Sequence, residues 1–169
     1  MTHGNVTFDR VPADDAARED PEAATREEIL DYWADRFGIP PAVFEPYTMW
    51  ERGKGKLWLF RGDAPDTVPI QGLGMTFLRT RQKFWKPTTD AVQRFGHHAT
   101  ANVIHLDAAQ AAAFVDGETI DIEWEGDWGF LIVTHDIAGE REPLGVGLYT
   151  YGELKSQIAK GRQRDLDSA

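Results

Sequence analysis

The chain has 169 residues, of which 41% are hydrophobic and 27% are charged, and its formal net charge is −10. This length is sufficient for one good core or for two small lobes that share an interface. The absence of cysteine excludes disulfides, thiolate metal ligands and cysteine nucleophiles. No apolar run approaches the ~18 residues of a membrane span, and no export leader is recognisable, so we expect a cytoplasmic protein without membrane association.

Positive charge is concentrated in a basic block, residues 47–105, where nine Lys/Arg stand against four Asp/Glu. By contrast, residues 1–46 and 106–149 are strongly acidic. The basic block also contains several Trp and Phe, and cations with flat rings suit a nucleic-acid surface, because cations bind phosphates and rings stack on bases. A solvated basic face over an ordinary core explains the same pattern, and we expect most of these rings inside.

The overall acidic excess is accompanied by six lysines against twelve arginines. This composition is typical of proteins from very salty cytoplasm, where dense surface carboxylates maintain solubility, so we expect a halophilic archaeon as the source. In such a cytoplasm the Debye length is about 3 Å at 1 M salt, so binding to phosphates depends on close contacts and stacking.

The first elements expected along the chain are a tail and a helix. Residues 1–24 show no apolar periodicity and are rich in Asp, Glu and Ala, so we predict a disordered acidic tail. Thr25 and Glu28 then form a capping-box pattern, followed by apolar residues at four-residue steps. Gly38 supplies a left-handed stop. This pattern predicts a helix between Thr25 and Gly38.

From residue 47 onwards the apolar period changes to two, which indicates strands. The segments 47–50 and 56–61 are separated by a glycine-rich turn, so we predict a β-hairpin. Residues 68–78, interrupted by Gly72 and Gly74, predict an irregular strand with bulges.

The second half of the chain combines short helices with short, glycine-marked strands. Two capped helices are expected at 87–96 and 107–117. Four strands are expected at 102–106, 119–124, 128–134 and 143–149. This pattern is typical of a small pseudobarrel, and it places a domain boundary near residues 85–87. We therefore expect an α+β lobe over 25–85 and a β-rich domain over 86–166.

Short motifs follow one another in a fixed order between residues 86 and 164. They are Lys86-Pro87-Thr88, Val103-Ile104-His105-Leu106, Phe114-Val115-Asp116-Gly117-Glu118, Gly129-Phe130-Leu131-Ile132-Val133, Pro143-Leu144-Gly145, Leu154-Lys155 and Lys160-Gly161-Arg162. In this order and spacing they resemble the PUA-like RNA-binding domain at the C-terminus of Sun/RsmF-type RNA cytosine-5 methyltransferases. The resemblance implies an α+β protein in which a PUA-like β pseudobarrel positions structured RNA for a partner activity. The smaller N-terminal α+β lobe resembles, more loosely, the lobe that often precedes PUA domains.

Some residues depart from the family pattern. Ser156 and Ala159 stand where the family usually has Asn and Pro, and Val146 follows Pro-Leu-Gly where a lysine is common nearby. The methyltransferases also use a cysteine thiolate and a glycine-rich sheet that binds S-adenosylmethionine, and this chain has neither cysteine nor a strand–GxGxxG–helix unit. We therefore expect no enzymatic activity and no cofactor.

Two groups of residues are candidates for RNA binding. The first group comprises Arg79, Arg81, Lys83, Trp85, Lys86 and Arg94, and the second comprises Lys155, Lys160, Arg162 and Arg164. The cations would contact phosphates, and Trp85 would stack on a base, although packing at a domain interface explains this tryptophan equally well. Solvation alone, or a frayed basic tail at the C-terminus, explains the cations without RNA. If both groups act, we expect segments 79–86 and 155–164 to form two walls of one cleft.

The histidines give weaker signals. His97 and His98 are adjacent and are expected to point apart, and with His105 they remain one ligand short of a metal site, so we predict no metal. His135 and Asp136 precede a turn, and Asp at a strand exit is usually a turn former rather than a catalytic group.

We expect a non-catalytic protein that recognises structured rRNA or tRNA and assists RNA modification or ribosome biogenesis. The alternative is a protein-interaction subunit that docks on an RNA-modification enzyme, such as an RNA methyltransferase, or on an assembling ribosome.

Overall fold

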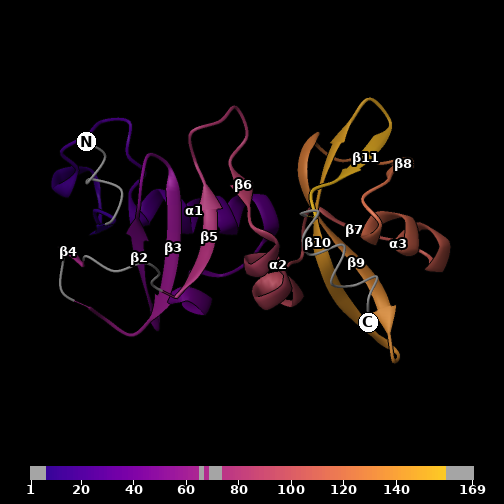
Figure 1. The fold of residues 1–169 in the computed structure, drawn as a ribbon, viewed down its shortest axis with the longest axis horizontal. Helices are drawn as coiled ribbons and strands as arrows, with labels where there is room; N and C mark the ends of the chain where they lie inside the picture. The colour runs from indigo at the N-terminus through magenta and orange to yellow at the C-terminus, as the bar shows by residue number, and fades with distance from the viewer. Residues whose placement is uncertain (1–6, 65–66, 69–73, 159–169) are drawn as a thin grey trace. The chain divides into compact units, whose positions relative to one another are not determined.

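The computed structural model describes residues 7–64, 67–68 and 74–158 (Figure 1). The chain divides into two compact units, Met1–Lys86 and Pro87–Ala169. Each unit combines short helices with a sheet of its own, and strands predominate, so the predicted α+β class is confirmed. None of the described helices is both long and apolar enough to cross a membrane.

The main helix of the N-terminal unit is α1 (Arg26–Phe37), and both of its ends follow the sequence signals. Thr25 Oγ1 accepts a hydrogen bond from the Glu28 amide at 3.1 Å, and Glu28 Oε1 accepts one from the Thr25 amide at 3.0 Å. The helix ends at Gly38, which adopts the left-handed conformation with φ 69°. The predicted helix is confirmed.

The N-terminal sheet has the strand order β4-β1-β2-β3-β5-β6. Its strands are β1 (Phe8–Arg10), β2 (Tyr47–Glu51), β3 (Lys56–Arg61), β4 (Thr67–Val68), β5 (Met75–Arg79) and β6 (Lys86–Pro87). The predicted hairpin of β2 and β3 is confirmed, and β3 pairs with β5 through a bulge between Leu57 and Trp58. Trp33 of α1 stacks on Phe77 of β5 with 5.2 Å between ring centroids, so the helix and the sheet share one core.

The predicted disordered tail is wrong for residues 7–24, while residues 1–6 lie outside the described part of the chain. Phe8 of β1 is fully buried, and Val11 is 5% exposed. Phe8 packs edge-on against Trp58 with 5.2 Å between ring centroids. This acidic segment is ordered because its two apolar residues are buried and β1 pairs with β2, about 40 positions further along the chain. Such long-range pairing cannot be recognised from local composition.

The C-terminal unit contains a five-stranded sheet in the order β7-β9-β10-β11-β8. Its elements are α2 (Thr89–Phe95), β7 (Val103–His105), α3 (Ala108–Val115), β8 (Thr119–Asp121), β9 (Gly129–Ile137), β10 (Glu140–Thr150) and β11 (Glu153–Ser156). β7 runs parallel to β9, and the other pairs are antiparallel. The predicted helices and strands are all present with shifted ends. Within the described residues the sheet is open, with β7 and β8 at its edges, and does not close into a barrel.

The core of the C-terminal unit lies between α3 and the sheet. Phe114 of α3 and Leu131, Val133 and Leu154 of the strands are all fully buried. Gly147 lies against this core, because a Cβ at this position would approach Leu154 Cδ1 to 2.5 Å. A side chain at this position would therefore force the Leu154 side chain to shift.

Two tight turns connect β9 to β10 and β10 to β11. The first turn contains Ala138 at φ 54° and Gly139 at φ 84°, and the second contains Tyr151 at φ 51° and Gly152 at φ 79°. Two successive positive φ angles are typical of the type I′ turn, which matches the twist of antiparallel hairpins. In each turn the first position carries a residue with a Cβ, which disfavours this conformation.

Candidate nucleic-acid interface

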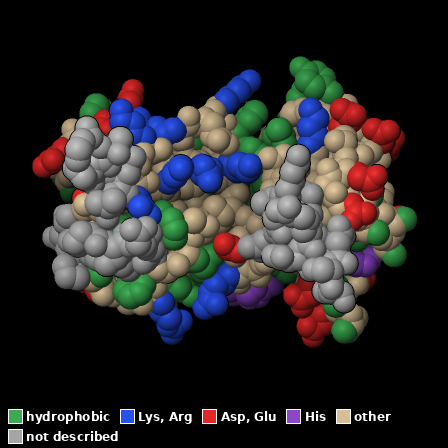
Figure 2. Space-filling view, viewed as in Figure 1, with side chains coloured by type: hydrophobic (Ala, Val, Ile, Leu, Met, Phe, Trp, Pro, Cys, Tyr) green, Lys and Arg blue, Asp and Glu red, His purple; other side chains and the backbone are tan. Residues whose placement is uncertain are grey.

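Arg79 is the first of the predicted RNA-binding residues along the chain and lies at the end of β5. It is exposed and stands directly opposite Lys56 of β3 in the sheet. Leu57 and Leu59 of β3 are buried, so the alternation of a strand places Lys56 and Trp58 on the opposite face. Figure 2 shows Lys and Arg side chains gathered over β3 and β5. Arg79 thus belongs to a cationic group that includes Lys56, which the sequence prediction did not single out.

Arg81 forms ion pairs with two acidic residues of the N-terminal segment. Its Nη1 donates a hydrogen bond to Glu22 Oε2 at 2.7 Å, and its Nη2 donates one to Asp20 Oδ2 at 3.4 Å. The hydrogen bond to Glu22 is the main cause that raises the pKa of Arg81. The pKa of Asp20 is lowered, chiefly by the hydrogen bond from the Glu22 backbone and further by Arg81. Arg81 is therefore partly neutralised within its own unit.

Lys83 and Phe84 form an exposed pair on the loop after β5. Lys83 Nζ lies 5.4 Å from the centroid of the Phe84 ring, which is 40% exposed. This distance is within the range of a cation–π contact. A cation and an exposed ring side by side could contact a phosphate and a base, as predicted for Lys83.

Trp85, the predicted stacking residue, packs against Tyr32 of α1. Its ring lies 5.4 Å from the ring of Tyr32, whose hydroxyl donates a hydrogen bond to the Trp85 carbonyl at 3.0 Å. Burial raises the pKa of the Tyr32 hydroxyl above its ordinary range, so it remains a donor. These contacts hold the Trp85 ring against a helix of its own unit, and base stacking by Trp85 stays a prediction. Next to it, burial lowers the pKa of Lys86, and the Arg79 charge lowers it further.

In the C-terminal unit the described candidates are Arg94 on α2 and Lys155 on β11, and both are exposed. Lys160, Arg162 and Arg164 lie outside the described residues. The cleft predicted between segments 79–86 and 155–164 therefore stays a prediction.

The described part of the C-terminal unit, 87–158, is strongly acidic. It contains three Lys/Arg, which are Arg94, Arg141 and Lys155, against twelve Asp/Glu. Of these cations, Arg141 donates a hydrogen bond to the Ala99 carbonyl at 3.1 Å. Neutralisation of several phosphates requires several cations. Among the described residues of this unit, phosphate contacts therefore depend on few cations.

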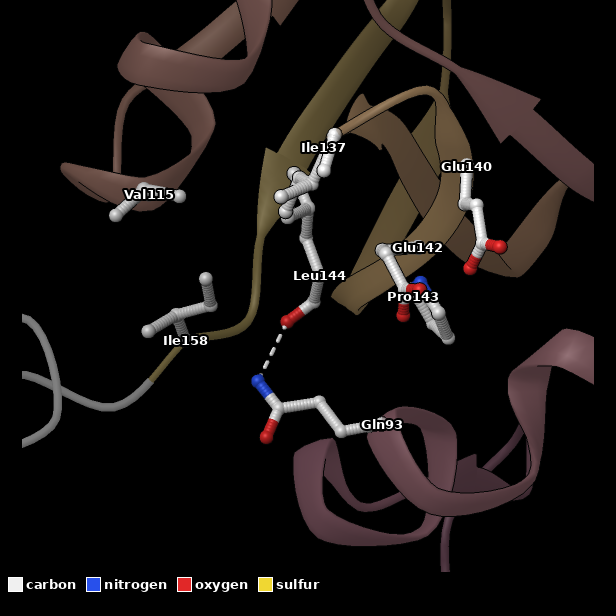
Figure 3. Close-up of a pocket in the computed structure, with 9 residues that line it drawn as sticks. Gln93, Val115, Ile137, Glu140, Glu142, Pro143, Leu144 and Ile158 are labelled. Carbon is white, nitrogen blue, oxygen red and sulfur yellow. Dashed lines mark hydrogen bonds between the residues drawn. The ribbon is translucent and has the colours of Figure 1, made fainter.

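A pocket of about 740 Å³ lies in the C-terminal unit beside α2, the end of α3 and the β9–β10 hairpin. Figure 3 shows Gln93 Nε2 joined to the Leu144 carbonyl, a hydrogen bond of 2.9 Å. The rest of the lining is mainly apolar, but Glu140 and Glu142 also border it. Two carboxylates repel phosphate, so this pocket is unsuited to a nucleic-acid backbone.

The adjacent histidines do not point apart as predicted. His97 and His98 lie in a short 3₁₀ turn, not in a strand, and their ring centroids are 4.0 Å apart. Burial, and then the neighbouring His97, lowers the pKa of His98. Within the described residues no group of three or more His, Asp or Glu could hold a metal ion.

The parallel pairing of β7 and β9 creates a polar cluster that sequence reasoning missed. His105 Nδ1 lies 2.9 Å from Thr134 Oγ1, and His105 Nε2 lies 3.5 Å from Asp136 Oδ1. His135 Nδ1 donates to the Leu106 carbonyl at 2.7 Å. The cluster ties the edge strand β7 to β9. No local signal could reveal it, because 29 residues separate its partners.

Comparison with known proteins links these observations to two families. Residues 101–164 match the family described as the methyltransferase RsmF PUA domain, and residues 2–74 match a family of unknown function, DUF7122. The chain is also 25% identical over 165 residues to the ribosomal RNA small subunit methyltransferase F of Aeromonas salmonicida (strain A449). That match covers 96% of this chain but 31% of the relative, so the chain spans about a third of that protein. The predicted resemblance is thus confirmed: residues 101–164 match the PUA domain of RsmF-type methyltransferases.

Proposed function

We propose that this protein binds structured RNA, either rRNA or tRNA, through its C-terminal unit and carries out no chemistry on it. The observation that carries this proposal is the match of residues 101–164 to the PUA domain of RsmF. The protein would serve RNA modification or ribosome biogenesis, because the similar relative is named as a ribosomal RNA methyltransferase.

The proposal includes a PUA-like pseudobarrel as the finer description of the C-terminal fold. Five strands over a common core support this assignment, as do the parallel pair β7–β9 and two short helices. Small barrels of this kind recognise nucleic acid by shape and backbone rather than by a linear sequence code.

The non-catalytic part of the proposal rests on the residues that the chain contains. Without cysteine, it cannot attack a cytosine ring by the thiolate route that the resemblance implies for the methyltransferases. Arg94 and Lys155 would contact phosphates of the folded RNA.

A filter-binding titration of the full chain with total rRNA and with tRNA tests this function. We expect saturable binding of at least one RNA, and weaker binding by the double variant Arg94→Ala/Lys155→Ala. Arg36→Ala, which removes a cation from α1 in the N-terminal unit, serves as a control and should bind as the unmodified protein does. Absence of saturable binding below high micromolar protein would refute the proposal.

A second candidate function is docking on a protein, and one observation favours it. Trp128 and Tyr151 are 47% and 82% exposed, and their rings lie 4.6 Å apart. Exposed aromatic pairs are common anchors of protein interfaces. In a pull-down with an RNA methyltransferase or ribosomal proteins, a partner that survives ribonuclease treatment and is lost in Trp128→Ala/Tyr151→Ala would support docking. Loss of the partner on ribonuclease treatment would instead support RNA binding.

A further inference from the structure

We propose that the N-terminal unit carries a second RNA site, at which the β2–β3 hairpin binds phosphates of a single-stranded segment and Trp58 stacks on a base. This inference rests on the proposed RNA-binding function, but it places a separate site outside the part that matches the PUA domain. It also assigns a role to a unit whose N-terminal residues match a family of unknown function.

The site begins with a pocket of about 390 Å³, here called the hairpin pocket, at the turn between β2 and β3. Its lining consists of Arg52, Gly53, Lys54, Lys56 and Trp58. Three of these five residues are cations and none is an acid, so the charge of the lining fits an anion. The lining of the hairpin pocket is therefore cationic, whereas two carboxylates, Glu140 and Glu142, border the pocket in the C-terminal unit.

The turn that shapes the hairpin pocket is fixed by hydrogen bonds. The Arg52 amide donates to the Lys56 carbonyl at 3.0 Å, and the Gly55 amide donates to Glu51 Oε2 at 2.8 Å. Gly53 adopts a positive φ of 71°. The carboxylate nearest in sequence, Glu51, thus holds the turn, and the strand alternation places it on the opposite face from Trp58.

Acids near the hairpin have cationic partners, and one of them also acts on the pocket, because the Lys54 charge contributes to the lowered pKa of Asp20. Asp20 and Glu22 bind Arg81, and Asp63 pairs with Arg10. Lys54 and Lys56 are exposed at the pocket rim. The lining itself contains no carboxylate, and a phosphate at the rim would compete with Asp20 for the Lys54 ammonium group.

Neighbouring aromatic residues hold the Trp58 ring in place. It stands opposite the fully buried Trp50 in the hairpin and meets Phe8 edge-on at 5.2 Å between centroids. The Arg52 guanidinium lies 5.5 Å from the Phe8 ring centroid. Trp58 itself remains half-buried and lines the pocket. A ring fixed in this way can stack on a base with little further loss of conformational freedom.

The cationic surface continues beyond the hairpin pocket. Lys56 at its rim lies directly opposite Arg79 on β5, so cations follow one another across two strands on the same face. An extended RNA strand places phosphates along such a row. Within the described residues, this face carries more cations for phosphate contacts than residues 87–158 of the C-terminal unit.

The test measures binding of the full chain to fluorescein-labelled oligouridylate, which has no stable structure, and in parallel to tRNA. For Lys54→Ala/Lys56→Ala we expect weaker oligouridylate binding and a plot of log K against log salt that is shallower by about 1.4, since each lost phosphate contact removes about 0.7. For Trp58→Leu we expect a loss of about 5- to 150-fold with an unchanged salt slope, because stacking is not ionic. Trp58→Phe should restore most of the affinity.

Two controls separate this site from the proposed C-terminal one. Arg94→Ala/Lys155→Ala should weaken tRNA binding and leave oligouridylate binding unchanged, and circular dichroism should confirm that each variant is folded. If both hairpin variants bind oligouridylate normally while tRNA still binds, the hairpin site is refuted and the proposed function stands. A loss with Lys54→Ala/Lys56→Ala but none with Trp58→Leu would refute base stacking and leave an anion site. Competition by polyaspartate as strong as that by oligouridylate would indicate an acidic protein partner and would also overturn the inference.

Discussion

Arg81 and Glu22 are joined by a hydrogen bond of 2.7 Å between Nη1 and Oε2, across 59 residues of sequence. This ion pair fastens the acidic N-terminal segment to the basic block. Both side chains are accessible to solvent, so salt screens the pair and its contribution to stability is small. Its importance lies in binding, because the same guanidinium cannot pair fully with Glu22 and with an RNA phosphate.

Release of Arg81 from its acidic partners should increase RNA affinity. We expect Asp20→Asn/Glu22→Gln to bind oligouridylate more tightly than the unmodified protein, since the change removes two negative charges and frees one cation. In a double-mutant cycle with Arg81→Ala, most of the gain should disappear. An equal gain without Arg81 would mean that the acids act by general repulsion and do not compete for this residue.

Trp85 should contribute to stability and not to RNA affinity, because its ring packs on Tyr32. Full burial of a Trp is worth 3–5 kcal/mol on replacement by Ala, so for this half-buried ring we expect a loss of about 2 kcal/mol in the free energy of unfolding. Tyr32→Phe, which removes the hydrogen bond to the Trp85 carbonyl, should cost about 1 kcal/mol. Urea denaturation measures both losses. A stable Trp85→Ala variant with weakened RNA binding would restore the stacking role.

Ala138 is strained at the tip of the β9–β10 hairpin, where its φ is 54°. Asn and Gly tolerate this conformation better than Ala, so Ala138→Asn or Ala138→Gly should raise the free energy of unfolding by about 0.5 to 1 kcal/mol. The control is Ala112→Gly on the exposed side of α3, where glycine should lower stability by about 1 kcal/mol. Equal destabilisation at both positions would show that Ala138 carries no strain.

Asp63 should make the free energy of unfolding depend on pH. Hydrogen bonds from Arg10 and from the Ala64 amide hold the pKa of the Asp63 carboxyl below its ordinary value of 3.8. A carboxyl with a lowered folded-state pKa stabilises the fold above its unfolded pKa and loses this contribution as pH falls through the folded pKa. Asp63→Asn should therefore be less stable than the unmodified protein near about pH 6, and the difference should shrink below about pH 4. Urea midpoints at a series of pH values measure it, and a constant difference would contradict the pairing.

The elements that the sequence predicted correctly have local signals. Thr25 with Glu28 and Asp107 with Gln110 form capping boxes in which both hydrogen bonds are present. The alternation in β2 and β3 likewise follows from side chains that neighbour each other along the chain. Such local signals predict where the helices begin and where the hairpin forms, and these predictions need no information about the rest of the fold.

Most of the relationships that sequence reasoning missed join residues that are distant in the chain. The burial of Phe8, the pairing of Arg81 with Glu22 and the contact of His105 with Asp136 each depend on how distant segments come together in the fold. The prediction of RNA-binding residues likewise could not recognise contacts between distant residues. It identified Arg79 from charge, but not Lys56 opposite it, because only the sheet register brings the two together.

The measurement that tests the account most directly is filter binding of the full chain to total rRNA and tRNA over a range of salt concentrations. The account predicts saturable binding, with an affinity that falls as salt rises and is reduced in Arg94→Ala/Lys155→Ala. Absence of saturable binding to either RNA below high micromolar protein, at low and at high salt, would contradict it.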